Sequence, residues 1–75
     1  MKFKVQLNSM EDAAKLVNRL EYYDYQADAE VGSHVIDARS LLGLLGFGLG
    51  RVLTLIIYAD SNENLREDIH ELLVA

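Results

Sequence analysis

The sequence contains no cysteine, so it can form neither a disulfide framework nor a thiolate metal site. It is also short of positive charge: 7 Lys and Arg residues stand against 12 Asp and Glu residues, which gives a formal net charge of −5. This balance argues against nucleic acid or an anionic membrane surface as a partner, because both bind proteins through Lys and Arg.

Long apolar runs are missing as well. The longest, residues 41–49, falls well short of the roughly 20 residues that span a bilayer, and three glycines interrupt it. The first residues alternate polar and apolar side chains instead of forming the apolar core of a signal peptide. Together with the absence of cysteine, these features fit a cytoplasmic protein without a membrane segment.

The residues that are present suffice for one small domain, residues 1–75, because 51% of them are apolar. Residues 2–7 alternate with a period of two, which predicts a strand with one buried face. A helix is predicted over residues 10–21, with Ser9 as its N-cap and Asp12 placed to return the bond in a capping box. The predicted buried face of this helix is Met10, Ala13, Leu16, Val17 and Leu20.

The rest of the chain predicts a hairpin, a short helix, a strand and a last helix. Strands at 26–31 and 34–37 flank a Gly-Ser turn signal, Ser40 caps a short helix, and residues 52–58 form a central strand. The last helix carries an apolar stripe and continues to the end of the chain: Leu65, Ile69, Leu72 and Leu73. The order β-α-β-β-α-β-α indicates an α+β fold, with helices on one face of one sheet. A ferredoxin-like arrangement is the nearest alternative.

This element order, at this length, is that of the HPr phosphocarrier family, and two segments carry the resemblance. Residues 35–50, V-I-D-A-R-S-L-L-G-L-L-G-F-G-L-G, resemble the family's segment around its regulatory serine. Residues 52–60, V-L-T-L-I-I-Y-A-D, resemble its last strand. The resemblance implies an HPr-like open-faced β-sandwich. It places Ser40 on the serine that a dedicated kinase phosphorylates in Gram-positive bacteria, and Gly43 on the family's helix glycine.

The family's phosphocarrier signature, Gly-aliphatic-His-Ala-Arg-Pro-Ala, is not kept. The corresponding residues 7–13 read L-N-S-M-E-D-A, so Ser9 stands at the histidine position, Glu11 replaces the arginine and Asp12 replaces the proline. A neutral imidazole accepts and releases a phosphoryl group, whereas a serine phosphoester does not pass it on in the same way. The two carboxylates would also repel the group that the arginine holds. We therefore expect no catalytic residue here.

The short helix offers two further candidate features. Ser40 at its start is either a plain N-cap or, as the resemblance implies, a regulatory phosphorylation site whose phosphate meets free N–H groups and the helix dipole. The helix also carries more large apolar residues than one stripe can bury. The resemblance assigns Leu41, Leu42 and Leu45 to partner binding, as an apolar patch suited to a protein partner or to self-association. The alternative is that more of these leucines lie in the core.

The other candidate residues have plain interpretations. His34 and His70 lack a cysteine, a nearby second histidine or a carboxylate at metal-ligand spacing, so both are expected on the surface. The tyrosines after the first helix lack the basic residues of a nucleic-acid platform, and the glycines follow no nucleotide-binding motif. We predict no metal, no cofactor and no enzyme activity.

These observations lead to a non-catalytic HPr-like regulatory or protein-interaction module, related to the sugar phosphotransferase system and to carbon catabolite control. Its expected partners are proteins, such as HPr kinase or a transcriptional regulator, and Ser40 is the candidate switch. Two alternatives stay open. One is a genuine phosphocarrier of the PEP-dependent sugar phosphotransferase system with a different nucleophile, and the other is a degenerate structural domain without phosphate chemistry.

Overall fold

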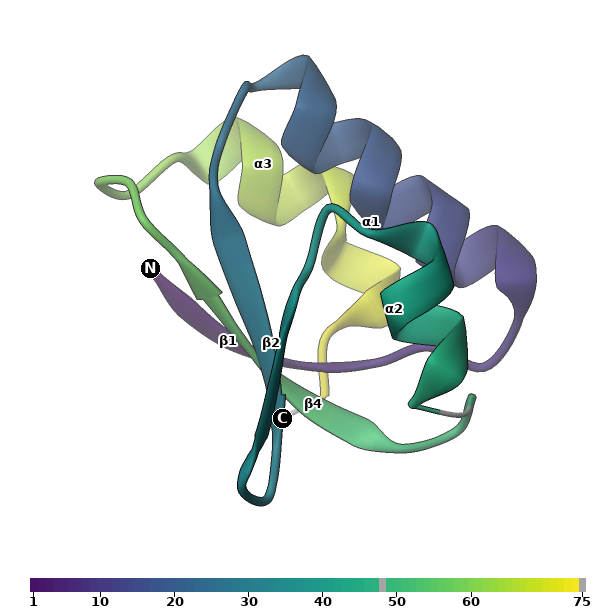
Figure 1. Cartoon of the computed structure of the whole chain (residues 1–75). Helices are drawn as coiled ribbons and strands as arrows, with labels where there is room; N and C mark the ends of the chain where they lie inside the picture. The colour runs from purple at the N-terminus through teal and green to yellow at the C-terminus, as the bar shows by residue number, and fades with distance from the viewer. Residues whose placement is uncertain (48, 75) are drawn as a thin grey trace.

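The predicted strands form one antiparallel sheet in the computed structural model, which describes residues 1–47 and 49–74 (Figure 1). The strand order across the sheet is β1-β4-β2-β3. The strand bounds are β1 Lys2–Gln6, β2 Ala27–Val31, β3 His34–Asp37 and β4 Val52–Ile57. As predicted, β4 is central: it pairs with β1 on one side and with β2 on the other.

Three helices lie on the same side of this sheet (Figure 1). Their bounds are α1 Met10–Tyr22, α2 Leu41–Gly46 and α3 Glu63–Asp68. The predicted order β-α-β-β-α-β-α and the α+β class are therefore confirmed. The strand order excludes the ferredoxin-like alternative, because β1 lies inside a ferredoxin-like sheet and here it lies at the edge, beside β4.

The core lies between the helices and the inner face of the sheet. On β4 every second side chain is buried, and on α1 the buried residues recur at helical spacing, so both periodicities point into the same core. The buried residues of these two elements are Ala13, Leu16, Val17, Leu20, Leu53, Leu55 and Ile57. Met10 was predicted on this face and is instead 56% exposed. It is the first residue of α1 and therefore extends beyond the part of the helix that covers the sheet.

The hairpin between β2 and β3 turns at Gly32 and Ser33, as predicted. Gly32 has a φ of 59°, which glycine adopts without the steric cost that a β-carbon brings. A positive φ at the first of the two turn residues is typical of the tight turns whose twist matches that of the flanking strands. This turn sets the register in which Ala29 lies opposite Ile36.

The prediction that a single helix runs to the end of the chain is wrong. The α-helix ends at Asp68, a 3₁₀ turn follows at His70–Leu72, and Leu73 then forms a bridge with Val5 of β1. Side chains three residues apart are eclipsed in a 3₁₀ turn, so the tighter winding lets Leu72 follow Ile69 into the core. The main chain is then free to extend along β1.

Candidate functional site

The N-terminus of α1 holds the residues that replace the phosphocarrier signature. The Ser9 hydroxyl accepts a hydrogen bond from the Asp12 N–H at 3.2 Å, as an N-cap does. The Asp12 carboxylate accepts from the Asn8 N–H at 2.9 Å, one residue before the bond that a capping box would make. The Ser9 oxygen is thus engaged with the helix, and no general base accepts its proton among the described residues.

The electrostatics of this helix end oppose a phosphoryl group. Glu11 and Asp12 occupy its first turn, and the exposed Glu11 carboxylate adds negative charge where a phosphate would approach. Carboxylates here stabilise the helix through its dipole, which is the ordinary structural role of acidic residues in a first turn. The geometry of Ser9, Glu11 and Asp12 accounts for a capped helix and provides nothing that would transfer phosphate.

The N-terminus of α2 has the same cap without the carboxylates. The Ser40 hydroxyl accepts from the Gly43 N–H at 3.1 Å, and the first turn of α2 contains no acidic residue. Ser40 is half-buried. A β-carbon on Gly43 would lie 3.2 Å from the Ser40 oxygen, so glycine at this position leaves room for the cap. The plain N-cap interpretation of Ser40 is therefore realised in the structure.

Two charged residues, Asp37 and Arg39, precede Ser40 closely in the sequence. The guanidinium of Arg39 lies 3.4 Å from the carboxylate of Asp24, whose side chain is largely exposed. The Asp37 carboxylate accepts from the Arg39 N–H at 2.9 Å. Arg39 is thus held by an exposed ion pair of small net worth, and its guanidinium can exchange partners at little cost.

The three leucines assigned to partner binding differ in exposure. Leu42 is 83% exposed, whereas Leu41 and Leu45 are half-buried and pack against the core. Leu44 is the residue of α2 that the core takes up fully. A six-residue helix has one inward stripe, and the leucine pairs on either side of it are divided between core and surface. Leu42 therefore projects from a base formed by its two half-buried neighbours.

The histidines are separate and exposed. The His34 ring lies on β3, 6.2 Å from the Phe47 ring, and His70 lies in the 3₁₀ turn. In the described part of the chain, no three His, Cys, Asp or Glu side chains gather into a metal site. Within the same residues, no helix is long and apolar enough to cross a membrane.

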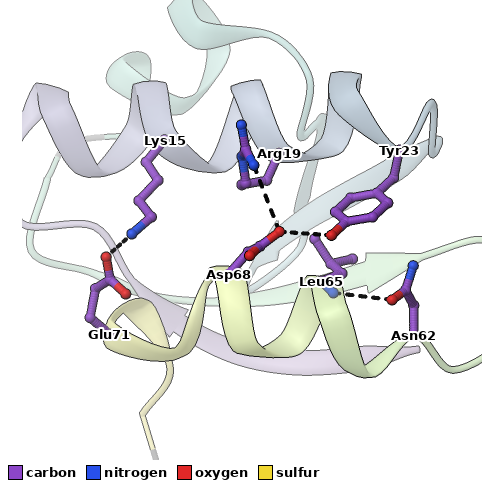
Figure 2. Close-up of polar contacts among 7 residues, drawn as sticks. All are labelled: Lys15, Arg19, Tyr23, Asn62, Leu65, Asp68 and Glu71. Atoms are coloured by element: carbon purple, nitrogen blue, oxygen red, sulfur yellow. Dashed lines mark hydrogen bonds and ion pairs between the residues drawn. The ribbon is translucent and has the colours of Figure 1, made fainter.

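A polar seam between α1 and α3 was not predicted from the sequence. Figure 2 shows the pairs that cross it: Lys15 with Glu71, Arg19 with Asp68, and Tyr23 with Asp68. The Tyr23 hydroxyl donates to Asp68 at 2.7 Å, and this bond, with partial burial, raises the pKa of Tyr23 above its ordinary value. The partners are 45 or more positions apart in the sequence, so no residue spacing within one helix predicts these contacts.

A hollow beside β1 was not predicted either. It measures about 430 Å³ and lies between β1, α3 and the last described residues. Its polar lining is Lys2, Lys4, Arg66 and His70, and its apolar lining includes Phe3 and Leu73. Alternating lysines on a terminal strand are a weak signal of such a site, since lysine on an edge strand also prevents aggregation.

The chain matches no protein-family model, and no curated protein matches it in sequence. Among solved structures, the crystal structure of HPr-C-His from Thermoanaerobacter tengcongensis superposes with a TM-score of 0.72. The alignment covers 95% of this chain and 88% of that one, at 18% sequence identity. The chain has the HPr-like fold. The predicted open-faced sandwich is thereby confirmed, and at this identity the likeness extends to the fold alone.

Proposed function

We propose that this HPr-like chain is a non-catalytic regulatory or protein-interaction module, related to phosphotransferase-system regulation in the cytoplasm, rather than a phosphocarrier or an enzyme. Its binding surface is α2, with Leu42 at the centre of contact and Leu41 and Leu45 beside it. Ser40 is the site at which phosphorylation regulates that surface. HPr kinase or a transcriptional regulator is the partner class that we assign.

The observation that carries the proposal is the 83% exposure of Leu42 on a helix whose other leucines reach the core. Most exposed large side chains on a small domain are scattered singly and need no explanation. Leu42 instead lies between two half-buried leucines, so a partner that covers it also removes the exposed parts of Leu41 and Leu45 from water.

The N-terminus of α1 supports the part of the proposal that the chain is not a phosphocarrier. A phosphocarrier needs a nucleophile that releases its phosphoryl group and a cation that holds it. Ser9 is occupied as an N-cap, and Glu11 and Asp12 give the surrounding turn the wrong charge. Neither histidine lies at this helix start, since His34 is on β3 and His70 is in the 3₁₀ turn.

Phosphorylation of Ser40 would change the charge beside Leu42. A kinase would transfer the γ-phosphoryl group of ATP to the Ser40 oxygen and form a monoester with a charge of roughly −1.5 to −2. Arg39 can leave its exposed pair with Asp24 to meet that charge, while Asp37 opposes it. A phosphate at this place would thus favour partners with a basic group near Leu42 over partners without one.

The test is intact-mass spectrometry after two separate incubations, one with Enzyme I and PEP and one with HPr kinase and ATP. The proposal expects no phosphate from PEP and one from ATP, mapped to Ser40 and lost in Ser40→Ala but kept in Ser9→Ala. Phosphate gained from PEP would make the chain a carrier. No phosphate in either incubation would remove the switch and leave the interaction surface.

The surface is tested separately by the affinity of HPr kinase for the chain. Leu42→Asp should abolish measurable binding, because it puts a charge into the centre of the contact. Val52→Asp is the matched control, since Val52 is also an exposed apolar residue but belongs to β4. Equal binding by both variants would refute the assignment of α2 and favour a purely structural domain.

A further inference from the structure

The hollow beside β1 combines an open strand edge with positive charge. Its volume is about 430 Å³, and a second hollow of about 250 Å³ shares Lys2, Phe3 and Arg66 with it and extends it towards Asn62. Together the two hollows run along β1 from Met1 to Lys4. A hollow that follows a strand has the shape of an extended peptide.

The charges in this hollow stand out against the rest of the molecule. Three of the 7 Lys and Arg residues form ion pairs with carboxylates: Lys15, Arg19 and Arg39. Of the four that form none within residues 1–47 and 49–74, Lys2, Lys4 and Arg66 line the hollow, and the fourth is Arg51. A chain with a net charge of −5 therefore gathers most of its uncompensated cations at one place, which favours an anionic ligand.

Among the described residues, the outer edge of β1 is unpaired at Lys2 and can accept another strand there. Ile57 donates to the carbonyl of Met1 at 2.8 Å, so the odd-numbered residues of β1 turn their main-chain groups towards β4. Val74 donates to the carbonyl of Lys4 at 2.9 Å from the other side. By the alternation of an antiparallel ladder, the N–H and C=O of Lys2 point outward in the same way. The chain itself thus pairs with one half of this edge, through the bridge of Leu73 to Val5.

We propose that this hollow binds an extended acidic segment of a partner protein, which adds to β1 as an edge strand beyond Val74. Its main chain would bond to the N–H and C=O of Lys2. Side chains of alternate residues would then point to the two sides of β1. Carboxylates on one side would meet Lys2 and Lys4, and carboxylates on the other would meet Arg66 and His70.

Edge lysines alone have a simpler purpose, since they discourage pairing between sheets. Arg66 of α3 and His70 of the 3₁₀ turn do not belong to the strand, however, and prevention of edge pairing does not require them. The site also lies apart from the proposed α2 surface, because β1 forms one edge of the sheet and α2 follows β3 at the other. Its failure in a test would therefore leave the proposed function untouched.

The probe is a blocked peptide of sequence Glu-Asp-Val-Glu-Asp, which carries carboxylates on both faces of an extended strand. It is titrated into the isotopically labelled chain and followed by amide chemical shifts. We expect the largest shifts at Lys2, Phe3 and Lys4, with further shifts at Arg66 and His70. The uncharged peptide Gln-Asn-Val-Gln-Asn should bind at least about tenfold more weakly, and added salt should weaken the binding of the acidic peptide. Equal affinity for the two peptides, or shifts centred on α2, would overturn the proposal.

Charge-reversal variants show whether peptide binding depends on the charge within the hollow or on the net charge of the chain. Arg66→Glu should weaken binding of the acidic peptide by about tenfold, because one attraction becomes one repulsion. Arg51→Glu changes the net charge equally, and Arg51 adjoins the end of β4 that pairs with Gln6, away from Lys2. Both residues are exposed, and Arg66→Gln serves as a milder second variant.

Equal effects of Arg66→Glu and Arg51→Glu would refute the site. Displacement of the peptide by an equal concentration of inorganic phosphate would assign it to small anions instead.

Discussion

The helices α1 and α2 both begin with a serine N-cap, but they have different roles in the fold. Each starts at a serine whose hydroxyl accepts from the N–H three residues later, at 3.2 Å for Ser9 and 3.1 Å for Ser40. The 13 residues of α1 bury four side chains, whereas the 6 residues of α2 bury only Leu44. The cap therefore marks the start of a helix but does not indicate the role of that helix.

The charges of the two first turns separate the helices further. Glu11 and Asp12 follow Ser9, and no acidic residue follows Ser40 in the first turn of α2. Acidic residues strengthen a helix end and at the same time exclude phosphate from it. In this chain, α1 is built to hold the sheet, and α2 retains an uncharged start and an exposed leucine that the fold does not require.

Truncation of leucines gives the largest expected difference between the helices. Leu16→Ala in α1 should lower the free energy of unfolding by about 2–5 kcal/mol, because it leaves a cavity in the core. Leu42→Ala in α2 should change it by no more than about 0.5 kcal/mol, because Leu42 is exposed. Urea unfolding followed by circular dichroism measures both.

Leu44→Ala is the control within α2, since Leu44 is as buried as Leu16. It should be as destabilising as Leu16→Ala. If Leu42→Ala proves equally costly, Leu42 belongs to the core, and the contrast between the two helices is lost together with the proposed surface.

Loss of the caps comes next in size. Ser9→Ala and Ser40→Ala should each cost about 1 kcal/mol, since each leaves one N–H of a first turn without its partner. Aspartate also caps well, so Ser40→Asp should restore most of the stability. Ser9→Asp should restore less, because its charge would meet Glu11 and Asp12. Equal rescue at both positions would show that the acidic turn of α1 is too well solvated to matter.

Two glycines of α2 allow a finer comparison. Gly46→Ala should stabilise the chain by about 0.5–1 kcal/mol, because alanine favours helix and nothing lies within 4 Å of the added carbon. Gly43→Ala should gain less, since its carbon would lie 3.2 Å from the Ser40 oxygen and 3.3 Å from a methyl group of Ile36. Thermal unfolding of the two single variants ranks them. A larger gain for Gly43→Ala would mean that the cap has room to spare.

Sequence periodicity predicted the elements well and their ends less well. The β-branched and aromatic residues of 52–58 and the apolar stripe of residues 10–21 are strong local signals, so β4 and α1 were predicted nearly to the residue. The last helix was predicted too long because Leu72 and Leu73 fit a helical stripe equally well. Only the position of β1 decides that Leu73 leaves the helix, and that contact is distant in sequence.

The site was less predictable than the fold, for a similar reason. The caps at Ser9 and Ser40 are local and were visible in the sequence. The division of the leucines into Leu44 inside and Leu42 outside depends on how α2 sits on the sheet, which no pattern within six residues fixes. The hollow at Lys2 and Arg66 joins the two ends of the chain, so only the folded topology brings its charges together.

The smallest expected effect belongs to Tyr23, which follows α1 and bonds to Asp68 of α3. Among the described residues, α2 has no such bond to another helix. The hydrogen bond to Asp68 raises the pKa of Tyr23, so the folded state favours the neutral phenol. This contribution is fully present below the ordinary tyrosine pKa of about 10 and is lost as the pH rises through the higher value in the folded state. Tyr58 behaves alike, because its bond to Asp28 raises its pKa.

In a Tyr58→Phe background, adding Tyr23→Phe should therefore reduce the loss of stability between about pH 8 and about pH 11, as measured by urea unfolding at each pH. Tyr22→Phe removes the hydroxyl of a 70% exposed neighbour that is a lesser cause of the raised Tyr23 pKa, so it should change that loss less than Tyr23→Phe does. An alkaline loss that is the same with and without the Tyr23 hydroxyl would show that the seam between α1 and α3 rests on its packing and ion pairs alone.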